Sequence, residues 1–201
     1  MSTPSLALRE KQAPIKDAYR KDPSSAIVTL TSSGSLDASS ITCKLSTGAA
    51  AKQAARIAGL HPKAGGPDPS LSGELCSGDM LLDALVACSG VTLKAVATAL
   101  GIPIASGTVR AEGDLDFKGT MGVDRDAPVG ITDIRLQFEV QFGEGRVVSE
   151  EEMERLGKLT ERYCVVLQTL VNKPRVAVRL AGREGSGEEG VVREVIHGSI
   201  L

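Results

Sequence analysis

The sequence predicts an α+β fold in which a largely antiparallel sheet curls around two long helices. Two stretches, residues 77–101 and 150–171, have the length and the apolar pattern of long helices. Stretches that alternate apolar and polar residues are grouped before, between and after these helices, and do not alternate with helices one by one. Grouped strands favour an α+β architecture over a parallel sheet built from βαβ units.

Residues 77–101 are predicted to form a central, buried helix. Their apolar side chains occupy nearly every side of the helical wheel, which is typical of a membrane span or of the central helix of a core. Charged side chains such as Asp79 and Lys94 interrupt the stretch too often for a span, which needs about 20 nearly unbroken apolar residues. We expect Ser77 to cap the start of this helix and Gly101 to end it. Because one sheet cannot cover all its sides, a second subunit is expected to cover the remainder.

The segments at the N-terminal end are predicted from short local patterns. Residues 1–25 carry prolines and mixed charges and are interpreted as an N-terminal arm, so that residues 26–201 form a single domain. A β-rich run at residues 26–31 and an alternating run at 39–45 are predicted strands, with a turn at 32–35 between them.

A long loop is predicted at residues 48–76. An alanine-rich piece leads there into a segment rich in Gly, Pro and Ser, and loops of this length are usually functional or mobile. Because the loop stands immediately before the central helix, we expect it to cover the mouth of the pocket and to set substrate choice.

Alternating strands and one capped helix follow the central helix. Apolar and polar residues alternate over 108–117 and 134–142, as in antiparallel strands with one solvated face. The sequence SEEE at 149–152 predicts a capping box at the start of the second long helix, which we expect to end before Pro174. The predictions for the rest of the chain are a strand at 176–180, a glycine-rich turn at 182–190 and an edge strand at 191–196.

Composition narrows the classes of function. The formal net charge of −2 gives no basic surface for nucleic acid, and aromatic residues make up only 2% of the chain. The N-terminus carries no apolar targeting segment, so we expect a cytoplasmic protein without membrane contact. The four cysteines lack CxxC spacing and resemble neither a disulfide framework nor a zinc module, so we expect free thiols and no metal or cofactor.

Two motifs point to a known family. They are DMLLDALVACSGVTLKAVA in the central helix and ERYCVVLQTL in the second long helix. Together they resemble the osmotically inducible protein C/organic hydroperoxide resistance (OsmC/Ohr) family, whose members carry a small-residue helix ending in Ala-Cys and, much later, a Tyr-Cys or Asn-Cys pair. The resemblance covers roughly residues 26–181. It implies an intertwined α+β homodimer with active sites at the subunit interface, and thiol-dependent reduction of organic hydroperoxides.

The resemblance assigns roles to individual residues. Cys88 matches the family's peroxidatic cysteine and Cys164 its resolving cysteine. Asp79 stands nine positions before Cys88 and matches the family's carboxylate, with Asp in place of the usual Glu. Nine residues turn a straight helix by about 900°, which places Asp79 on the face opposite Cys88. Asp79 is therefore expected to serve the partner's site. The family's active-site arginine has no motif to match here, and Arg20 and Arg56 are its candidates.

The implied reaction begins when the Cys88 thiolate attacks the distal peroxide oxygen, which releases an alcohol and leaves a sulfenic acid. Cys164 condenses with this sulfenic acid to a disulfide, which an external dithiol reduces. Val165 replaces the proline that commonly follows the second cysteine in the family. Without the resemblance, a cysteine in an apolar helix is most often an inert filler of the core, and its activation would require a nearby cation.

A second group of residues and a second class of function stay open. Four residues could converge at the start of the central helix as a redox or metal-binding group, although their spacing matches no standard metal motif: His61, Glu74, Cys76 and Asp79. The alternative function is a non-catalytic protein that binds a hydrophobic small molecule in the dimer crevice. An unreactive Cys88 would distinguish it from a peroxidase. A metal hydrolase would need more His and carboxylate ligands than this chain groups together.

Overall fold

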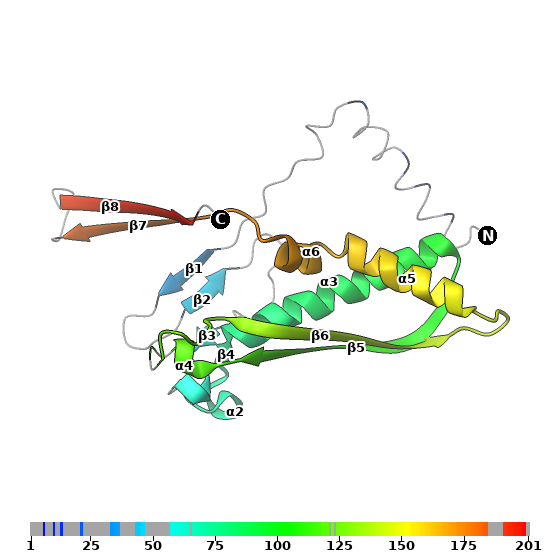
Figure 1. The fold of residues 1–201 in the computed structure, drawn as a ribbon, viewed down its shortest axis with the longest axis horizontal. Helices are drawn as coiled ribbons and strands as arrows, with labels where there is room; N and C mark the ends of the chain where they lie inside the picture. The colour runs from blue at the N-terminus through cyan, green and yellow to red at the C-terminus, as the bar shows by residue number, and fades with distance from the viewer. Residues whose placement is uncertain are drawn as a thin grey trace.

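A computed structural model describes most of the chain from residue 57 onward and short pieces before it. The described residues are 6, 10, 13, 21, 33–36, 43–46, 57–64, 66–120, 122, 124–184 and 191–199. In chain order the elements are β1 (Ser33–Leu36), β2 (Cys43–Ser46), β3 (Ile57–Gly59), η2 (Pro62–Ala64), α2 (Pro69–Ser72), β4 (Leu75–Cys76), α3 (Ser77–Leu100), β5 (Ile104–Leu115), α4 (Phe117–Thr120), β6 (Ile131–Phe142), α5 (Glu150–Tyr163), α6 (Val165–Asn172), β7 (Val176–Glu184) and β8 (Val191–Ser199) (Figure 1). This order is a mixed α and β fold, as predicted.

The described strands form three sheets. One runs in the order β1–β2–β3–β4, with β3 and β4 parallel and the other pairs antiparallel. β5 pairs with β6 antiparallel, from Ile104 opposite Phe142 to Leu115 opposite Ile131. β7 pairs with β8, also antiparallel. The predicted strands at 108–117 and 134–142 are therefore confirmed and are longer than expected, although Phe117 already belongs to α4.

α3 is the long helix that the sequence predicts. Gly101 ends it in the left-handed conformation, with φ 69°, and its N–H bonds back to the last turn, which a residue without a side chain does at low cost. The prediction that Ser77 caps the start is wrong by one residue. Cys76 is the N-cap and makes no side-chain capping bond, so Ser77 is already helical.

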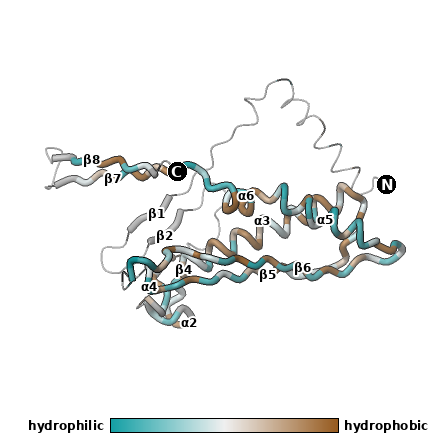
Figure 2. Tube along the Cα trace, in the orientation of Figure 1, coloured by the Kyte–Doolittle hydropathy of each residue, from teal (hydrophilic) through white to brown (hydrophobic). Residues whose placement is uncertain are grey.

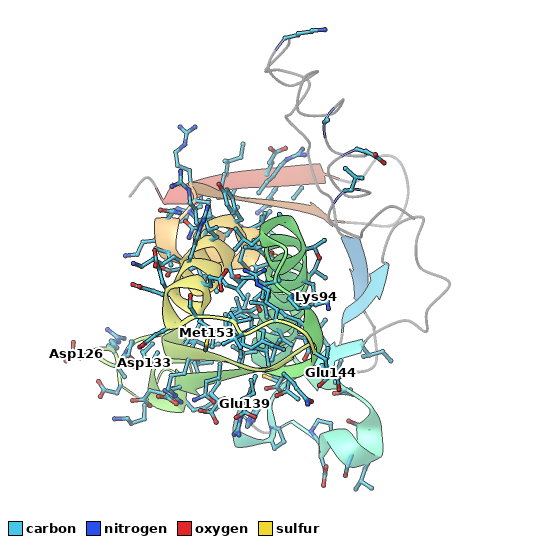
Figure 3. The ribbon with its side chains drawn as sticks, turned by 90° about the vertical axis from the view of Figure 1, so that its right-hand side faces the viewer. Lys94, Asp126, Asp133, Glu139, Glu144 and Met153 are labelled. Atoms are coloured by element: carbon cyan, nitrogen blue, oxygen red, sulfur yellow. The ribbon has the colours of Figure 1, made fainter. Side chains whose placement is uncertain are left out.

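The helices and the β5–β6 pair form two layers around the core. Figure 3 shows α3 and α5 on one side of the β5–β6 pair, with side chains filling the space between helices and strands. The core cluster comprises Leu93, Ala97, Ile102 and Leu156. Arg146 links the two helices at one end, because its guanidinium donates to the Gly101 carbonyl and to the Glu152 carboxylate.

Only one face of α3 is buried within a single chain. The buried residues recur every fourth position: Leu85, Ser89, Leu93 and Ala97. Apolar residues on another face are exposed, among them Leu81, Ala84 and Val91, and Val91 is 73% exposed. Figure 2 shows that hydrophobic residues run along much of α3. By length and composition alone, α3 could cross a membrane, but the core helix of a soluble protein has the same properties.

The second long helix is divided. The predicted capping box is present, because the Glu152 N–H donates to Ser149 Oγ at 3.2 Å and the Ser149 N–H donates to Glu152 Oε2 at 3.1 Å. The prediction of one helix to residue 171 is wrong, since α5 ends at Tyr163 and α6 starts at Val165.

Cys164 is the residue at which the helix is interrupted. Its ψ of 106° is extended, far from the helical value. Its N–H still bonds to the Thr160 carbonyl at 3.0 Å, and its own carbonyl accepts from the Gln168 N–H at 2.9 Å. Cys164 is thus the C-cap of α5 and the N-cap of α6 at the same time. The Gln168 side-chain amide donates a hydrogen bond to the Glu161 carbonyl at 3.0 Å.

The C-terminal hairpin extends away from the two-layer body (Figure 1). β7 and β8 confirm the strands predicted at 176–180 and 191–196. The predicted turn at 182–190 begins too early, because residues 182–184 belong to β7. Apolar residues on one face of this hairpin, including Val178 and Leu180, are more than half exposed in one chain.

The region before α3 is described in part. The strand predicted at 26–31 lies outside the described residues, and the turn predicted at 32–35 is wrong because β1 forms there. The strand predicted at 39–45 corresponds to β2, which lies slightly later. The described part of the 48–76 loop consists of short elements, and β4 brings it directly to the start of α3. The division into an arm and one domain stays a prediction.

Candidate functional site

Two thiols from separate helices meet in the core. Cys88 lies in the middle of α3 and is half-buried, whereas Cys164 lies between α5 and α6 and is 0% exposed. Both are free thiols, and they are hydrogen-bonded to each other. The packing of α3 against α5 and α6 makes this contact possible.

Cys88 faces the start of α6. The backbone N–H groups of Val166 and Val165 donate to its sulfur, and the hydroxyl of Thr92, one turn further along α3, also contacts the sulfur. The same hydroxyl contacts the Cys88 carbonyl oxygen, as its donor at 2.8 Å. The first N–H groups of a helix have no partner within the helix and carry partial positive charge, so this position favours an anion.

The balance of these contacts lowers the pKa of the Cys88 thiol. Burial raises the pKa, but the Val166 N–H, the Cys164 thiol, the Val165 N–H and the Thr92 hydroxyl all lower it, and together they outweigh burial. A thiol whose charged form accepts several hydrogen bonds ionises more readily. Cys88 is therefore the thiol of the pair that is prepared to act as a thiolate.

Cys164 has the opposite tendency. Burial raises the pKa of its thiol, the Leu167 N–H lowers it, and the hydrogen bond and charge of Cys88 raise it again, with a further lowering by the Val166 N–H. The net pKa is above the ordinary value. In the pair, Cys164 holds the proton and donates it toward Cys88, so the two sulfurs are chemically unequal.

Asp79 does not join this pair within one chain. It is exposed in the first turn of α3, and nine residues along a helix separate it from Cys88 by about 14 Å. The helical rotation also places it on the opposite face. Arg20 and Arg56, the candidates for an activating arginine, lie outside the described residues.

The second predicted group does not form a metal site in the described part of the chain. No three His, Cys, Asp or Glu side chains gather there closely enough to hold a metal ion. The His61 ring packs on Phe117, with ring centroids 4.9 Å apart. The Glu74 carboxylate lies over the backbone of Gly59, while Cys76 is the N-cap of α3.

Sequence reasoning missed the groups that surround the Cys88 sulfur. Two of them are backbone N–H groups, which no residue type identifies. A sequence signal existed for Thr92, because it stands one helical turn after Cys88 and so faces the same side of α3. The break itself had a weak signal, since β-branched Val165 and Val166 lower helix propensity just after Cys164.

The chain is similar to known proteins in its sequence and in its fold. The sequence model of the family described as OsmC-like protein matches residues 70–179. A solved OsmC-like protein of unknown function from Vibrio cholerae is similar in structure, with a TM-score of 0.58 and 14% identity over 71% of this chain and 94% of that one. An OsmC-like protein from Mycoplasma pneumoniae has a TM-score of 0.56 and 18% identity over 73% of this chain and 89% of that one. No curated protein matches the sequence.

Proposed function

Because the chain belongs to the family of OsmC-like proteins, and because its two core thiols are in contact and unequal in acidity, we propose that it is a thiol-dependent peroxidase for organic hydroperoxides. The single observation that carries this proposal is the position of Cys88. Its sulfur faces the start of α6 and also contacts a second thiol that holds a proton. Such a pair supplies both a nucleophile and a resolving group.

The proposed chemistry follows from the inequality of the two thiols. The Cys88 thiolate attacks the distal oxygen of the hydroperoxide, the O–O bond breaks, and Cys88 becomes a sulfenic acid. The alkoxide takes up a proton, for which Cys164 is the proposed donor, and leaves as an alcohol. The Cys164 thiolate then attacks the Cys88 sulfur and expels hydroxide, and a disulfide forms. An external dithiol reduces this disulfide to two thiols and becomes a disulfide itself.

A homodimer belongs to this proposal. One chain leaves two apolar surfaces uncovered, the Leu81–Val91 face of α3 and the Val178–Leu180 face of the hairpin. A second copy that covered both would intertwine with the first and would bring its Asp79 toward the partner's Cys88. Obligate dimers bury upwards of about 2,000 Å². Sedimentation showing a stable monomer at micromolar concentration would contradict this part of the proposal.

The test of the proposal is a disulfide formed by the substrate itself. One equivalent of cumene hydroperoxide should link Cys88 to Cys164 and leave Cys43 reduced, as measured by peptide mapping. In Cys164→Ser, one equivalent should oxidise Cys88 to a sulfenic acid, and further equivalents should oxidise it to a sulfinic acid, because no resolving thiol remains. A link from Cys88 to a cysteine other than Cys164 would keep the class of enzyme but change the resolving residue.

A second candidate function rests on the exposed face of α3. Leu81 and Val91 would line an apolar crevice in a dimer, and a protein that binds a hydrophobic small molecule could use such a crevice without chemistry. Full retention of any peroxidase activity in Cys88→Ser would favour this candidate. The cytoplasm is the proposed location in either case, and nucleic acid and membrane are not proposed partners.

A further inference from the structure

A groove of about 400 Å³ runs between α5 and the β5–β6 pair and leads down to Cys164. Its lining is Ser89, Leu136, Phe138, Gly157, Thr160, Glu161, Cys164 and Leu167. Gly157 and Glu161 are exposed and lie one helical turn apart on α5, so they form the rim. Ser89, Thr160 and Cys164 are 0–1% exposed and form the floor.

The groove is lined by one cysteine of the pair and not by the other. Cys164 is 0% exposed, so a molecule in the groove has to displace the side chains around it to reach the Cys164 sulfur. Cys164 lies at its floor and is also hydrogen-bonded to Cys88, whereas Cys88 does not belong to the lining. Cys88 is half-buried and lies on the face of α3 that carries the exposed residues Leu81 and Ala84. The groove therefore lies apart from that face of α3.

The surface of the groove suits an uncharged molecule. Leu136, Phe138 and Leu167 give it apolar walls. The two hydroxyls on the floor have already donated their hydrogens, Ser89 to the Val86 carbonyl at 3.2 Å and Thr160 to the Leu156 carbonyl at 2.7 Å. The Glu161 carboxylate stands at the rim and would repel an anion, since like charges disfavour each other at short range.

We propose that this groove is the entry route of the reductant, an uncharged thiol compound, which attacks the Cys164 sulfur of the oxidised protein. The proposal rests on the proposed function, because it needs a disulfide between Cys88 and Cys164. At the rim, a side chain added at Gly157 would meet no atom within 4 Å of its Cβ. The rim is therefore open where a thiol would enter.

Each bond in the proposed step is accounted for. A thiolate of the reductant bonds to the Cys164 sulfur, the disulfide bond breaks, and Cys88 leaves with the electron pair as a thiolate. The second thiol of the reductant then displaces Cys164, which takes up a proton, and the reductant departs as a disulfide. The sulfur that leaves as the more stable thiolate leaves faster, and the start of α6 stabilises that state on Cys88.

The first experiment maps the site of attack in the unaltered protein. The disulfide is formed with diamide, which requires no peroxidase activity, and is then treated briefly with mercaptoethanol and iodoacetamide. We expect peptide mapping to find mercaptoethanol on Cys164 and the alkyl group on Cys88. The reverse pattern would overturn the proposal. Failure of hydroperoxide to form the disulfide would instead contradict the proposed function, so the two failures are distinguishable.

A second experiment blocks the groove. Gly157→Leu should slow reduction of the disulfide by dithiothreitol by about tenfold or more, while oxidation of the reduced protein by hydroperoxide keeps its rate. Lys158→Leu is the matched control, because Lys158 is the next residue of α5 and its side chain is 71% exposed. It should leave both steps unchanged. Reduction of Gly157→Leu at the rate of the unaltered protein would overturn the proposal.

The charge at the rim gives a third readout that a purely structural change would not move. Mercaptoethanol and mercaptopropionate are similar in size, but only the latter is an anion. Glu161→Gln should increase the rate of reduction by mercaptopropionate relative to mercaptoethanol by a few-fold. An unchanged ratio would contradict entry past Glu161.

Discussion

Two helices of this protein begin at a cysteine, and only one of these helix starts faces the proposed nucleophile. α3 begins after Cys76 and α6 begins after Cys164. At the start of α6, the N–H groups of the first two residues donate to the sulfur of Cys88, which comes from another helix. At the start of α3, the Cys76 side chain makes no capping bond.

The difference teaches that a cysteine beside a helix N-terminus does not necessarily accept hydrogen bonds from the first N–H groups of that helix. The thiol has to lie in front of the free N–H groups, and at α6 the packing of α3 brings Cys88 to that position. The break at Cys164 creates these free groups in the middle of what would otherwise be one helix. The proposed site therefore depends on the interruption as much as on the two cysteines.

The largest expected effect comes from removing Cys88, which faces the start of α6, in comparison with Cys76, which precedes the start of α3. Cys88→Ser should abolish turnover of an organic hydroperoxide, because serine is not a thiolate nucleophile. Cys76→Ser should keep turnover within about twofold, since this residue contacts neither sulfur of the pair. Steady-state assays with a coupled dithiol measure both. Equal loss in the two variants would remove the distinction between the helix starts.

A smaller effect is expected from removing one N–H group at each helix start. Proline is tolerated at the first position of a helix, which is Val165 in α6 and Ser77 in α3. Val165→Pro should raise the pKa of Cys88 and slow its oxidation at neutral pH by about threefold. Ser77→Pro should change neither.

The residues before both positions have extended backbones, as a following proline requires. Each variant is therefore expected to fold, which circular dichroism would check. An equal rise in the pKa of Cys88 in the two variants would contradict the special role of α6. Proline is also what the OsmC/Ohr family commonly has after the second cysteine. A faster Val165→Pro variant would mean that the N–H of residue 165 is not needed.

The smallest effect is expected at Thr92. Thr92→Val removes a hydroxyl that contacts the Cys88 sulfur and should slow oxidation about twofold by raising the pKa of that thiol. Thr98→Val is the control, because Thr98 makes the same bond to the carbonyl four residues earlier, at 2.7 Å, but lies away from the sulfur. Stopped-flow oxidation of both variants separates loss of the helix bond from loss of the sulfur contact.

Local signals predicted much of the fold. The alternation over β6, the capping box at Ser149 and the glycine that ends α3 are each determined within a few residues, and all three are present. The break at Cys164 had only a weak local signal and was not predicted. The apolar residues of the second long helix keep the helical period across the interruption, and Val165 stands where a proline would have indicated a helix start.

The proposed site was predicted only in part, because it also depends on the break at Cys164. The helical period indicated that Cys88 and Cys164 both point inward, but not what surrounds the sulfurs. From the sequence, a cation was expected beside Cys88. The described structure places N–H donors there, and these depend on the backbone conformation at Cys164.

The most direct test of the central claim is the pH dependence of Cys88 oxidation in the reduced protein. Lowering of the pKa means that the thiolate persists to lower pH, so the rate should rise with pH with a midpoint below about 8.5, the ordinary pKa of a cysteine thiol. The measurement is the stopped-flow rate with an organic hydroperoxide across pH, in the unaltered protein and in Val165→Pro. The account predicts a midpoint below the ordinary value that moves upward in the variant. A midpoint at or above the ordinary value, unmoved by the substitution, would contradict it.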